Sequence, residues 1–163
     1  MAMAEPTDFV LGEYPRTFDE RYRIAIPTEL LGSLGADGAD CILAKERPGC
    51  LSLWNAANWQ SRLDQGVELI KAKMKAGKLE GQIPRVQLLG RLLSTRHRIV
   101  QLAGRGRLLV PEGFREFLRA EAGSEVLLVG AAVCVEIWHP ETWFKYLEGE
   151  IPKFRRLFDH LSG

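Results

Sequence analysis

The amino-acid sequence repeats part of itself at a fixed spacing of 84 residues. Identical residues stand at this spacing in the pairs Arg21 and Arg105, Arg23 and Arg107, Pro27 and Pro111, Leu43 and Leu127, Cys50 and Cys134, Trp54 and Trp138, Trp59 and Trp143, and Leu63 and Leu147. One ungapped spacing over roughly 45 residues, with two pairs of tryptophans, is not expected by chance. The chain is therefore predicted to be a tandem duplication, and its fold must accommodate two copies of one unit.

The duplication predicts four segments. They are a first unit (9–63), a helical connector (64–92), a second unit (93–147) and a C-terminal helix (148–163). A unit of about 50 residues buries too little surface to be stable alone. Packed together, two copies would cover each other's open face and sheet edges. We therefore expect an intramolecular pseudo-dimer.

Each unit is predicted to hold a strand, a short helix, two strands and a second short helix. The runs "RIAIP" and "RLLVP" are aliphatic and end at a proline, which suits the first turn of a helix better than a sheet. Helices are expected over 28–34 and 111–123. Hairpins are expected over 41–54 and 125–138, with turns near Pro48–Gly49 and Ala131–Ala132. Closing helices begin at Asn55 and His139, whose side chains are expected to act as caps.

Charge is unevenly distributed along the chain. The 163 residues include 22 basic and 21 acidic side chains, for a net charge of +1. Residues 1–63 carry −3, residues 64–98 carry +5 and residues 99–163 carry −1. Part of the basic excess is Lys71, Lys73, Lys75 and Lys78 of the connector. A solvated helix face is the simpler interpretation of these lysines, and a surface for phosphates or a second subunit is the alternative.

Three longer stretches carry a resemblance to a known family. They are "LGEYPRTFDERYRIAIPTEL", "LLGRLLST" and "VLLVGAAVCVEIWHPETWFKY", and their order and spacing cover nearly the whole chain. In these stretches the sequence resembles the MraZ family, which has the SpoVT/AbrB-like fold. The resemblance implies an α+β, β-rich chain. In it, two tandem SpoVT/AbrB-like units form a pseudo-two-fold swapped-hairpin β-barrel with short helices.

The family signature in each half is Asp-x-x-x-Arg, usually with glycine before the arginine. The first copy keeps Asp19 and Arg23 but has Tyr22 at the glycine position. The second copy keeps Gly106 and Arg107 but has Ala103 at the aspartate position. The two halves therefore depart from the signature in complementary ways, and we expect them to contribute unequally.

The resemblance implies an oligomeric, ring-forming transcriptional regulator. Such a protein would bind direct repeats in double-stranded DNA upstream of its own operon, the division and cell-wall gene cluster. It would be cytoplasmic and nucleoid-associated. The expected DNA-binding residues are Arg16, Asp19, Arg21, Arg23, Arg105 and Arg107. Arg96, His97 and Arg98 are weaker candidates because they adjoin the connector.

The chemistry of arginine supports a role in DNA binding independently of the family resemblance. A guanidinium is a planar fork of donors that fits two phosphate oxygens or the O6/N7 edge of guanine. Alternate residues of a strand share a face, so each arginine pair is expected to point to one side. A ring would multiply weak single sites through high effective concentration, which would offset the low net charge.

Two other interpretations remain open at this stage. Paired arginines on an exposed strand can serve only solubility or protect a sheet edge. The chain could also be an antitoxin-like protein–protein interaction module with weak or no DNA binding. Its contact would then be an acidic end or the apolar stripe of Ile151, Phe154, Leu157, Phe158 and Leu161. Packing of this stripe within the oligomer is the simpler expectation.

No enzyme is expected. "GRGR" at 104–107 lacks the strand and helix of a dinucleotide loop. The three histidines are scattered and the three cysteines lack metal-binding spacing, so no catalytic residue, metal, cofactor or small-molecule substrate is predicted. The repeated tryptophans and Cys50 with Cys134 are expected in the interior. No apolar run can span a bilayer, and residues 1–9 lack the pattern of a signal peptide, so no membrane partner is expected.

Overall fold

The computed structural model describes residues 9–35 and 38–163. Residues 1–8, most of the stretch inspected for a signal peptide, lie outside this range. The strands are β1 (Val10–Thr17), β2 (Arg23–Ala25), β3 (Asp40–Arg47), β4 (Cys50–Asn55), β5 (His97–Gln101), β6 (Arg107–Leu109), β7 (Glu125–Ala132) and β8 (Val135–Trp138). The helices are α1 (Thr28–Leu31), α2 (Ala56–Lys75), α3 (Ile83–Thr95), α4 (Phe114–Leu118), α5 (Pro140–Glu150) and α6 (Phe154–Ser162), with the 3-10 helix η1 (Ile151–Lys153) before α6. The mixed α+β class is confirmed.

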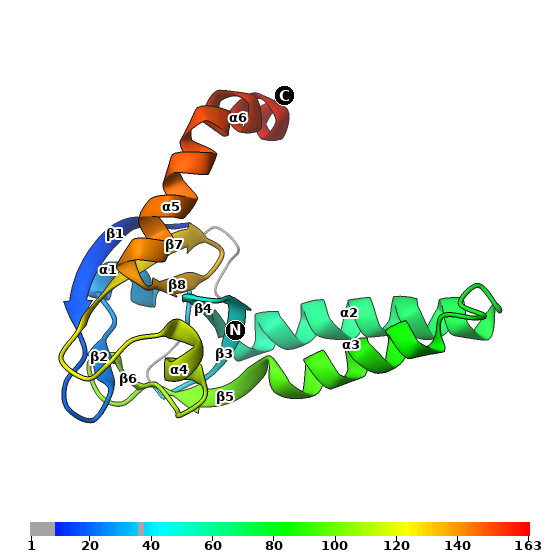
Figure 1. The fold of residues 1–163 in the computed structure, drawn as a ribbon, viewed down its shortest axis with the longest axis horizontal. Helices are drawn as coiled ribbons and strands as arrows, with labels where there is room; N and C mark the ends of the chain where they lie inside the picture. The colour runs from blue at the N-terminus through cyan, green and yellow to red at the C-terminus, as the bar shows by residue number, and fades with distance from the viewer. Residues whose placement is uncertain (1–8, 36–37) are drawn as a thin grey trace.

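The larger sheet combines strands from both copies of the repeat. Its order is β1-β7-β8-β4-β3-β5, and every neighbouring pair is antiparallel. The two hairpins lie side by side through β4 and β8, while β1 pairs with the hairpin of the second copy and β5 with that of the first. Each copy therefore completes the other's sheet (Figure 1). Among the described strands this sheet has two free ends, at β1 and β5, so the expected closed barrel is not present as a continuous hydrogen-bonded sheet.

A second, two-stranded sheet joins equivalent segments of the two copies. Strand β6 follows β2 at the repeat spacing, and the two pair antiparallel with Ile24 opposite Leu108. These two side chains are buried, at 2% and 0% exposure. The repeated strand before each proline, predicted from the sequence, is thus confirmed, although each strand has only three residues. Strands β1 and β5 precede them and were not predicted.

The main hydrophobic core is shared by the two copies. Its fully buried members include Leu30, Leu43, Leu51 and Leu53 of the first copy and Leu108, Leu118, Leu128 and Ile137 of the second. A smaller cluster under α5 contains Trp138 and Trp143, which are 2% and 8% exposed. Trp54 and Trp59 of the first copy are only partly buried. The expectation of core tryptophans is therefore met fully in the second copy alone.

Local predictions at the helix starts are confirmed. The Asn55 side chain accepts from the Asn58 N–H at 3.1 Å, and His139 Nδ1 accepts from the Glu141 N–H at 3.2 Å. The helix after Asn55 is much longer than expected, because α2 continues through the connector to Lys75. The connector does break between Lys75 and Ile83, where the sequence has two glycines.

One predicted hairpin turn is displaced. The first hairpin turns at Pro48–Gly49 as expected, whereas the second turns at Val133–Cys134, two residues later than predicted. Strand β7 extends through Ala132, and Cys134 lies in the turn while remaining 4% exposed. Cys134 is thus buried as predicted but is not part of a strand.

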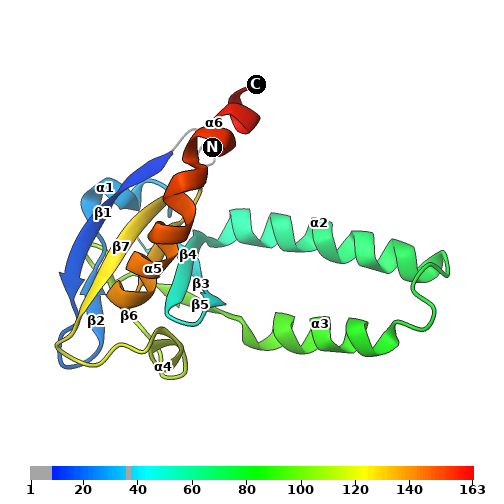
Figure 2. The ribbon, with the colours of Figure 1, turned by 45° about the horizontal axis from the view of Figure 1, so that its top comes forward.

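Two helical segments project from the sheets. The α2–α3 hairpin forms one arm, and α5 with α6 forms another (Figures 1 and 2). Apolar side chains on these arms are exposed, including Leu88 and Leu92 of α3 and Phe154, Leu157 and Leu161 of α6. No helix among the described residues has the length and apolar character needed to cross a bilayer.

Candidate nucleic-acid interface

The two repeated arginine phrases form two tight turns with the same backbone closure. In the first, the Tyr22 N–H donates to the Asp19 carbonyl at 3.1 Å, and the Asp19 N–H donates to the Arg23 carbonyl at 3.0 Å. In the second, the equivalent bonds join Gly106 to Ala103 at 3.1 Å and Ala103 to Arg107 at 2.8 Å. The duplication is therefore preserved in the hydrogen bonds of the turns as well as in the sequence.

The turns lead into β2 and β6, whose outward face carries the second arginine of each phrase. Arg23 lies opposite Leu109, and Ala25 lies opposite Arg107. Because Ile24 and Leu108 between them are buried, these four residues share the opposite, outward face. We call residues 19–25 and 103–109 together the arginine ribbon.

The other two arginines are placed differently from expectation. Arg21 and Arg105 lie in the turns before the strands, and Arg105 has a positive φ of 64°. The alternation of a strand therefore does not set their direction, and the argument from alternation is wrong for them. It does apply to Arg23 and Arg107, which both occupy strand positions.

Asp19 organises the first turn. Its Oδ1 accepts from the N–H groups of Arg21 at 2.8 Å and Arg23 at 2.9 Å, while its Oδ2 accepts from Arg23 Nε at 2.8 Å. These bonds hold the pKa of Asp19 below its ordinary value, chiefly through the Arg23 backbone N–H and further through the Arg23 side chain. The carboxylate thus remains charged, and it fixes the orientation of the Arg23 guanidinium.

The second turn lacks this carboxylate. Ala103 has no side-chain acceptor, so only backbone groups close the turn. Arg105 and Arg107 are both exposed, and neither forms an ion pair with any acidic side chain within residues 9–35 and 38–163. Among the described residues, the first half of the ribbon therefore has one arginine paired with a carboxylate, Arg23, and the second half has none.

The glycine position of the signature also differs between the turns. Tyr22 adopts a left-handed φ of 59°, and Gly106 adopts 74°. The Tyr22 ring packs against Phe18, with ring centroids 6.1 Å apart, and the Arg115 guanidinium lies 4.0 Å from its centre. These contacts accompany a backbone conformation that costs an L-residue about 1–2 kcal/mol. The first turn thus accommodates the Tyr22 side chain at the position where the signature has glycine.

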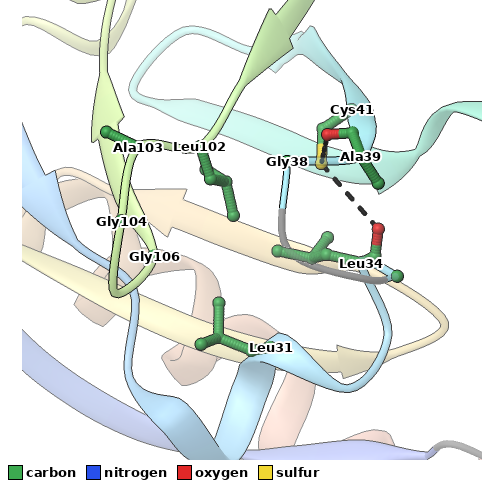
Figure 3. Close-up of a pocket in the computed structure, with 10 residues that line it drawn as sticks. Leu31, Leu34, Gly38, Ala39, Cys41, Leu102, Ala103, Gly104 and Gly106 are labelled. Carbon is green, nitrogen blue, oxygen red and sulfur yellow. Dashed lines mark hydrogen bonds between the residues drawn. The ribbon is translucent and has the colours of Figure 1, made fainter.

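Gly106 instead lies against Leu31, which stands in the first copy where Arg115 stands in the second. A Cβ at Gly106 would come within 2.9 Å of Leu31 Cδ2. The turn from Ala103 to Gly106 borders a cavity of about 330 Å³ that is also lined by α1 and Cys41 (Figure 3). The second turn therefore packs its glycine against an aliphatic side chain, Leu31, whereas the first turn packs its own tyrosine ring against Phe18.

The remaining candidates lie apart from the outward face of the strands. Arg16 is near the end of β1, where its Nη1 donates to the Pro15 carbonyl at 2.8 Å. Arg96 Nε donates to the Lys45 carbonyl at 3.0 Å, and the His97 ring lies 5.3 Å from the Trp59 ring. Arg96 and His97 are thus engaged in contacts within the fold. Arg98 is exposed on β5.

Comparison with known proteins places these features in a family. A family model described as "MraZ protein, putative antitoxin-like" matches residues 97–158. A "Transcriptional regulator MraZ" from Carboxydothermus hydrogenoformans is 30% identical over 139 residues, which cover 85% of this chain and 87% of that protein. The chain belongs to the MraZ family. MraZ proteins of Thermoanaerobacter pseudethanolicus and Heliobacterium modesticaldum, both with the same printed description, are 27% and 29% identical over 94% and 93% of the chain.

The family model and the relatives cover different parts of the arginine ribbon. The model match starts at β5 and includes the second turn, whereas the MraZ relatives are similar over most of the chain. Membership of the MraZ family, which the sequence predicted, is thus confirmed.

The three cysteines of the chain are buried. Burial raises the pKa of Cys41 to about 11 and that of Cys134 to about 12, and it raises the pKa of Cys50 as well. These thiols are therefore protonated near neutral pH and are poor nucleophiles. Within the described part of the chain, no three His, Cys, Asp or Glu side chains gather as metal ligands would.

Sequence reasoning missed two residues of the outward face. Ala25 and Leu109 lie two positions after Arg23 and Arg107, so strand alternation would have placed them on the same side. Leu109 is 56% exposed despite being a large aliphatic residue. Strand alternation counted from Arg107 predicts Leu109 on this face, whereas the charged residues alone do not.

Proposed function

We propose that the chain is a DNA-binding transcriptional regulator that contacts double-stranded DNA through the arginine ribbon. The observation that carries this proposal is the repeated turn-and-strand unit, which brings together Arg21, Arg105 and Arg107, all exposed, and Arg23, which is partly exposed. A two-stranded β-ribbon fits the major groove, where arginine recognises guanine. The MraZ relatives, described as transcriptional regulators, support the same conclusion.

Different roles are proposed for the six candidate residues. Arg21, Arg105 and Arg107 contact phosphates or base edges, and Arg23 does so in an orientation fixed by Asp19. Asp19 itself is a positioning residue, because both of its carboxylate oxygens accept hydrogen bonds within the turn and an anion is repelled by the phosphates. Arg16, near the end of β1, would contact a flanking phosphate.

The assembly that we propose is a ring of subunits, each formed by two SpoVT/AbrB-like units (9–63 and 93–147) with swapped hairpins. The pairing of β1 with β7 and of β5 with β3 supports the exchange between units. Exposed apolar side chains on α3 and α6 support contacts between subunits. A ring would engage direct repeats upstream of its own operon in the division and cell-wall gene cluster, in the nucleoid, with affinity raised by multivalency.

Substitution of paired arginines tests the proposal. Arg21→Ala with Arg105→Ala, and Arg23→Ala with Arg107→Ala, should each weaken binding to the DNA upstream of the chain's own gene. The matched control is Arg155→Ala with Arg156→Ala, which removes two positive charges from exposed positions on α6. Equal affinity of a folded ribbon variant and the control would contradict the proposed site.

Salt provides an independent test of the mechanism. Binding through phosphates releases counterions, so the logarithm of affinity should fall linearly with the logarithm of salt concentration. Arg21→Ala with Arg105→Ala should reduce the magnitude of that slope by about two if both arginines contact phosphates, and Arg23→Ala with Arg107→Ala should reduce it by less, because Asp19 partly neutralises Arg23. A flat salt response in the unmodified protein would argue against phosphate contacts altogether.

An interaction module for a protein partner is the second candidate. It is favoured by the exposed apolar stripe of α6, on which Phe154, Phe158 and Leu161 are 65%, 58% and 74% exposed. Purification of the chain from its host as a stable complex with a second small protein, without any shift of DNA, would support this candidate over the first.

A further inference from the structure

The outward face of the arginine ribbon contains apolar residues between its arginines. Leu109 is 56% exposed, and Ala25 is exposed as well. The face therefore alternates cationic and aliphatic side chains, along each strand and across the pair. Phosphate binding gives no reason for this pattern, because aliphatic groups gain nothing from an anion.

The strand register sets the spacing of the four residues. Leu109 is directly opposite Arg23, and Arg107 is directly opposite Ala25. Directly opposed residues of an antiparallel pair are about 5 Å apart, and residues two positions apart along a strand are about 7 Å apart. Base pairs are stacked about 3.4 Å apart, so the face spans about two base-pair steps. An arginine and its aliphatic neighbour can thus meet adjacent base pairs.

The major groove offers one apolar group to such a neighbour. The C5-methyl of thymine is the aliphatic feature of that groove, and apolar side chains contact it in sequence-specific complexes. Arginine recognises guanine beside it through O6 and N7. A face with both kinds of side chain therefore matches a sequence in which guanine and thymine are neighbours.

We infer that Leu109 is a specificity-determining residue that packs against a thymine methyl group next to the base pair contacted by Arg23. This inference rests on the proposed function, because it assumes that the arginine ribbon enters the major groove. Asp19 supports this assignment, since it fixes the orientation of the guanidinium of Arg23, the residue whose backbone position is directly opposite Leu109.

The inference also predicts an asymmetry within one subunit. Ala25 is the repeat equivalent of Leu109, and its single methyl group reaches less far from the strand. Only the Leu109 side of the ribbon should therefore require thymine strongly. The two halves would recognise related but unequal sequences, although their backbones are paired by a local two-fold symmetry.

Removal of the methyl group from DNA tests this directly. The unmodified protein would first select duplexes from a random-sequence library. The best duplex would then be synthesised with 2′-deoxyuridine at each thymine in turn, which removes only the C5-methyl group. We expect one thymine per site whose replacement weakens binding about fourfold, as for one methyl group returned to water.

The same scan with Leu109→Ala should show no loss at that thymine. Leu11→Ala is the matched control, because Leu11 is similarly exposed, at 65%, but lies on β1. It should retain the full thymine dependence. Ala25→Leu should gain a second thymine dependence at the position related by the local symmetry. Thermal unfolding of each variant would verify that the fold is retained.

The possible failures are distinguishable. If the protein selects a duplex but no uracil substitution weakens binding, or if Leu109→Ala keeps the same dependence, the inference is wrong and the proposed function stands. If the protein selects no duplex, the proposed function fails and the inference fails with it.

Discussion

In the turn from Asp19 to Tyr22, a carboxylate accepts two backbone N–H groups and holds the following arginine by its Nε. In the turn from Ala103 to Gly106, the same backbone closure exists with no side-chain acceptor. Duplication preserved the fold of the turn, and divergence changed what surrounds its arginines. The two copies therefore share the backbone conformation of the turn but differ in the charge around its arginines.

The difference between the turns has an electrostatic consequence. The charge of Arg23 is partly compensated by Asp19, whose Oδ2 lies 2.8 Å from Arg23 Nε. Arg105 and Arg107 have no such partner among the described acidic residues. A cation that is already paired has less to gain from a phosphate, because it must share or leave its partner. The second turn should therefore dominate the electrostatic part of DNA binding, and the first should contribute more to orientation.

Removal of the arginines from one turn at a time should give the largest effect. Arg105→Ala with Arg107→Ala is expected to weaken DNA binding about 100-fold and to reduce the salt slope by about two. Arg21→Ala with Arg23→Ala should reduce the slope by about one, since Arg23 is partly neutralised. Titration of a fluorescent duplex at several salt concentrations measures both quantities. Equal slopes for the two variants would remove the electrostatic distinction between the turns.

The glycine of the second turn should have the next largest effect. Gly106→Ala forces an L-residue into a φ of 74° and brings its Cβ within 2.9 Å of Leu31. We expect a loss of about 1–2 kcal/mol of unfolding free energy, measured by chemical denaturation.

Gly104 provides a matched control two residues away. A Cβ there would meet nothing within 4 Å, and its φ is not in the left-handed region. Gly104→Ala should be neutral or slightly stabilising. A Gly106→Ala variant as stable as Gly104→Ala would show that the second turn tolerates a side chain as the first tolerates Tyr22.

The acid stability of the first turn should depend on Asp19. Its pKa is lowered in the folded state, so its contribution is present above the ordinary value of 3.8 and is lost as the pH falls through the folded-state value. Asp19→Asn should reduce thermal stability near neutral pH and should flatten the decline at acid pH. Glu20→Gln is the control, because the Glu20 side chain forms no hydrogen bond or ion pair with any residue of 9–35 or 38–163. Identical acid profiles for both variants would contradict the role of Asp19.

The features that occur in both copies could be predicted from the sequence, because the spacing of 84 residues between the copies is visible without a structure. The short strands before Pro27 and Pro111 and the caps at Asn55 and His139 occur in both copies and were predicted, and the break of the connector was predicted from its glycines and proline. Strands β1 and β5 were missed, because exposed edge strands such as β1 have no clear alternation of apolar residues. Their pairing with the other copy's hairpin depends on contacts far apart in the chain.

The candidate interface was only partly predictable for a similar reason. The arginines were visible as a repeated phrase, but strand alternation was extended too far, into the turns that contain Arg21 and Arg105. A left-handed residue such as Tyr22 reverses the chain locally and ends the alternation. The pairing of Arg23 with Asp19 requires the closed turn, which the composition of the segment does not reveal.

Restoration of the missing carboxylate should give the smallest effect and tests the comparison most directly. If charge compensation is what separates the two turns, Ala103→Asp should pair with Arg107 as Asp19 pairs with Arg23. An exposed ion pair contributes about 0–1 kcal/mol, so the change in stability should be small. The salt slope of DNA binding should fall by up to about one, because Arg107 would then be partly neutralised. Ala103→Asn is the control, since its amide can accept the same backbone hydrogen bonds without a charge. If both variants alter the salt slope equally, the hydrogen bonds of the turn determine the effect and its charge does not. The difference between the two turns would then be one of backbone rigidity.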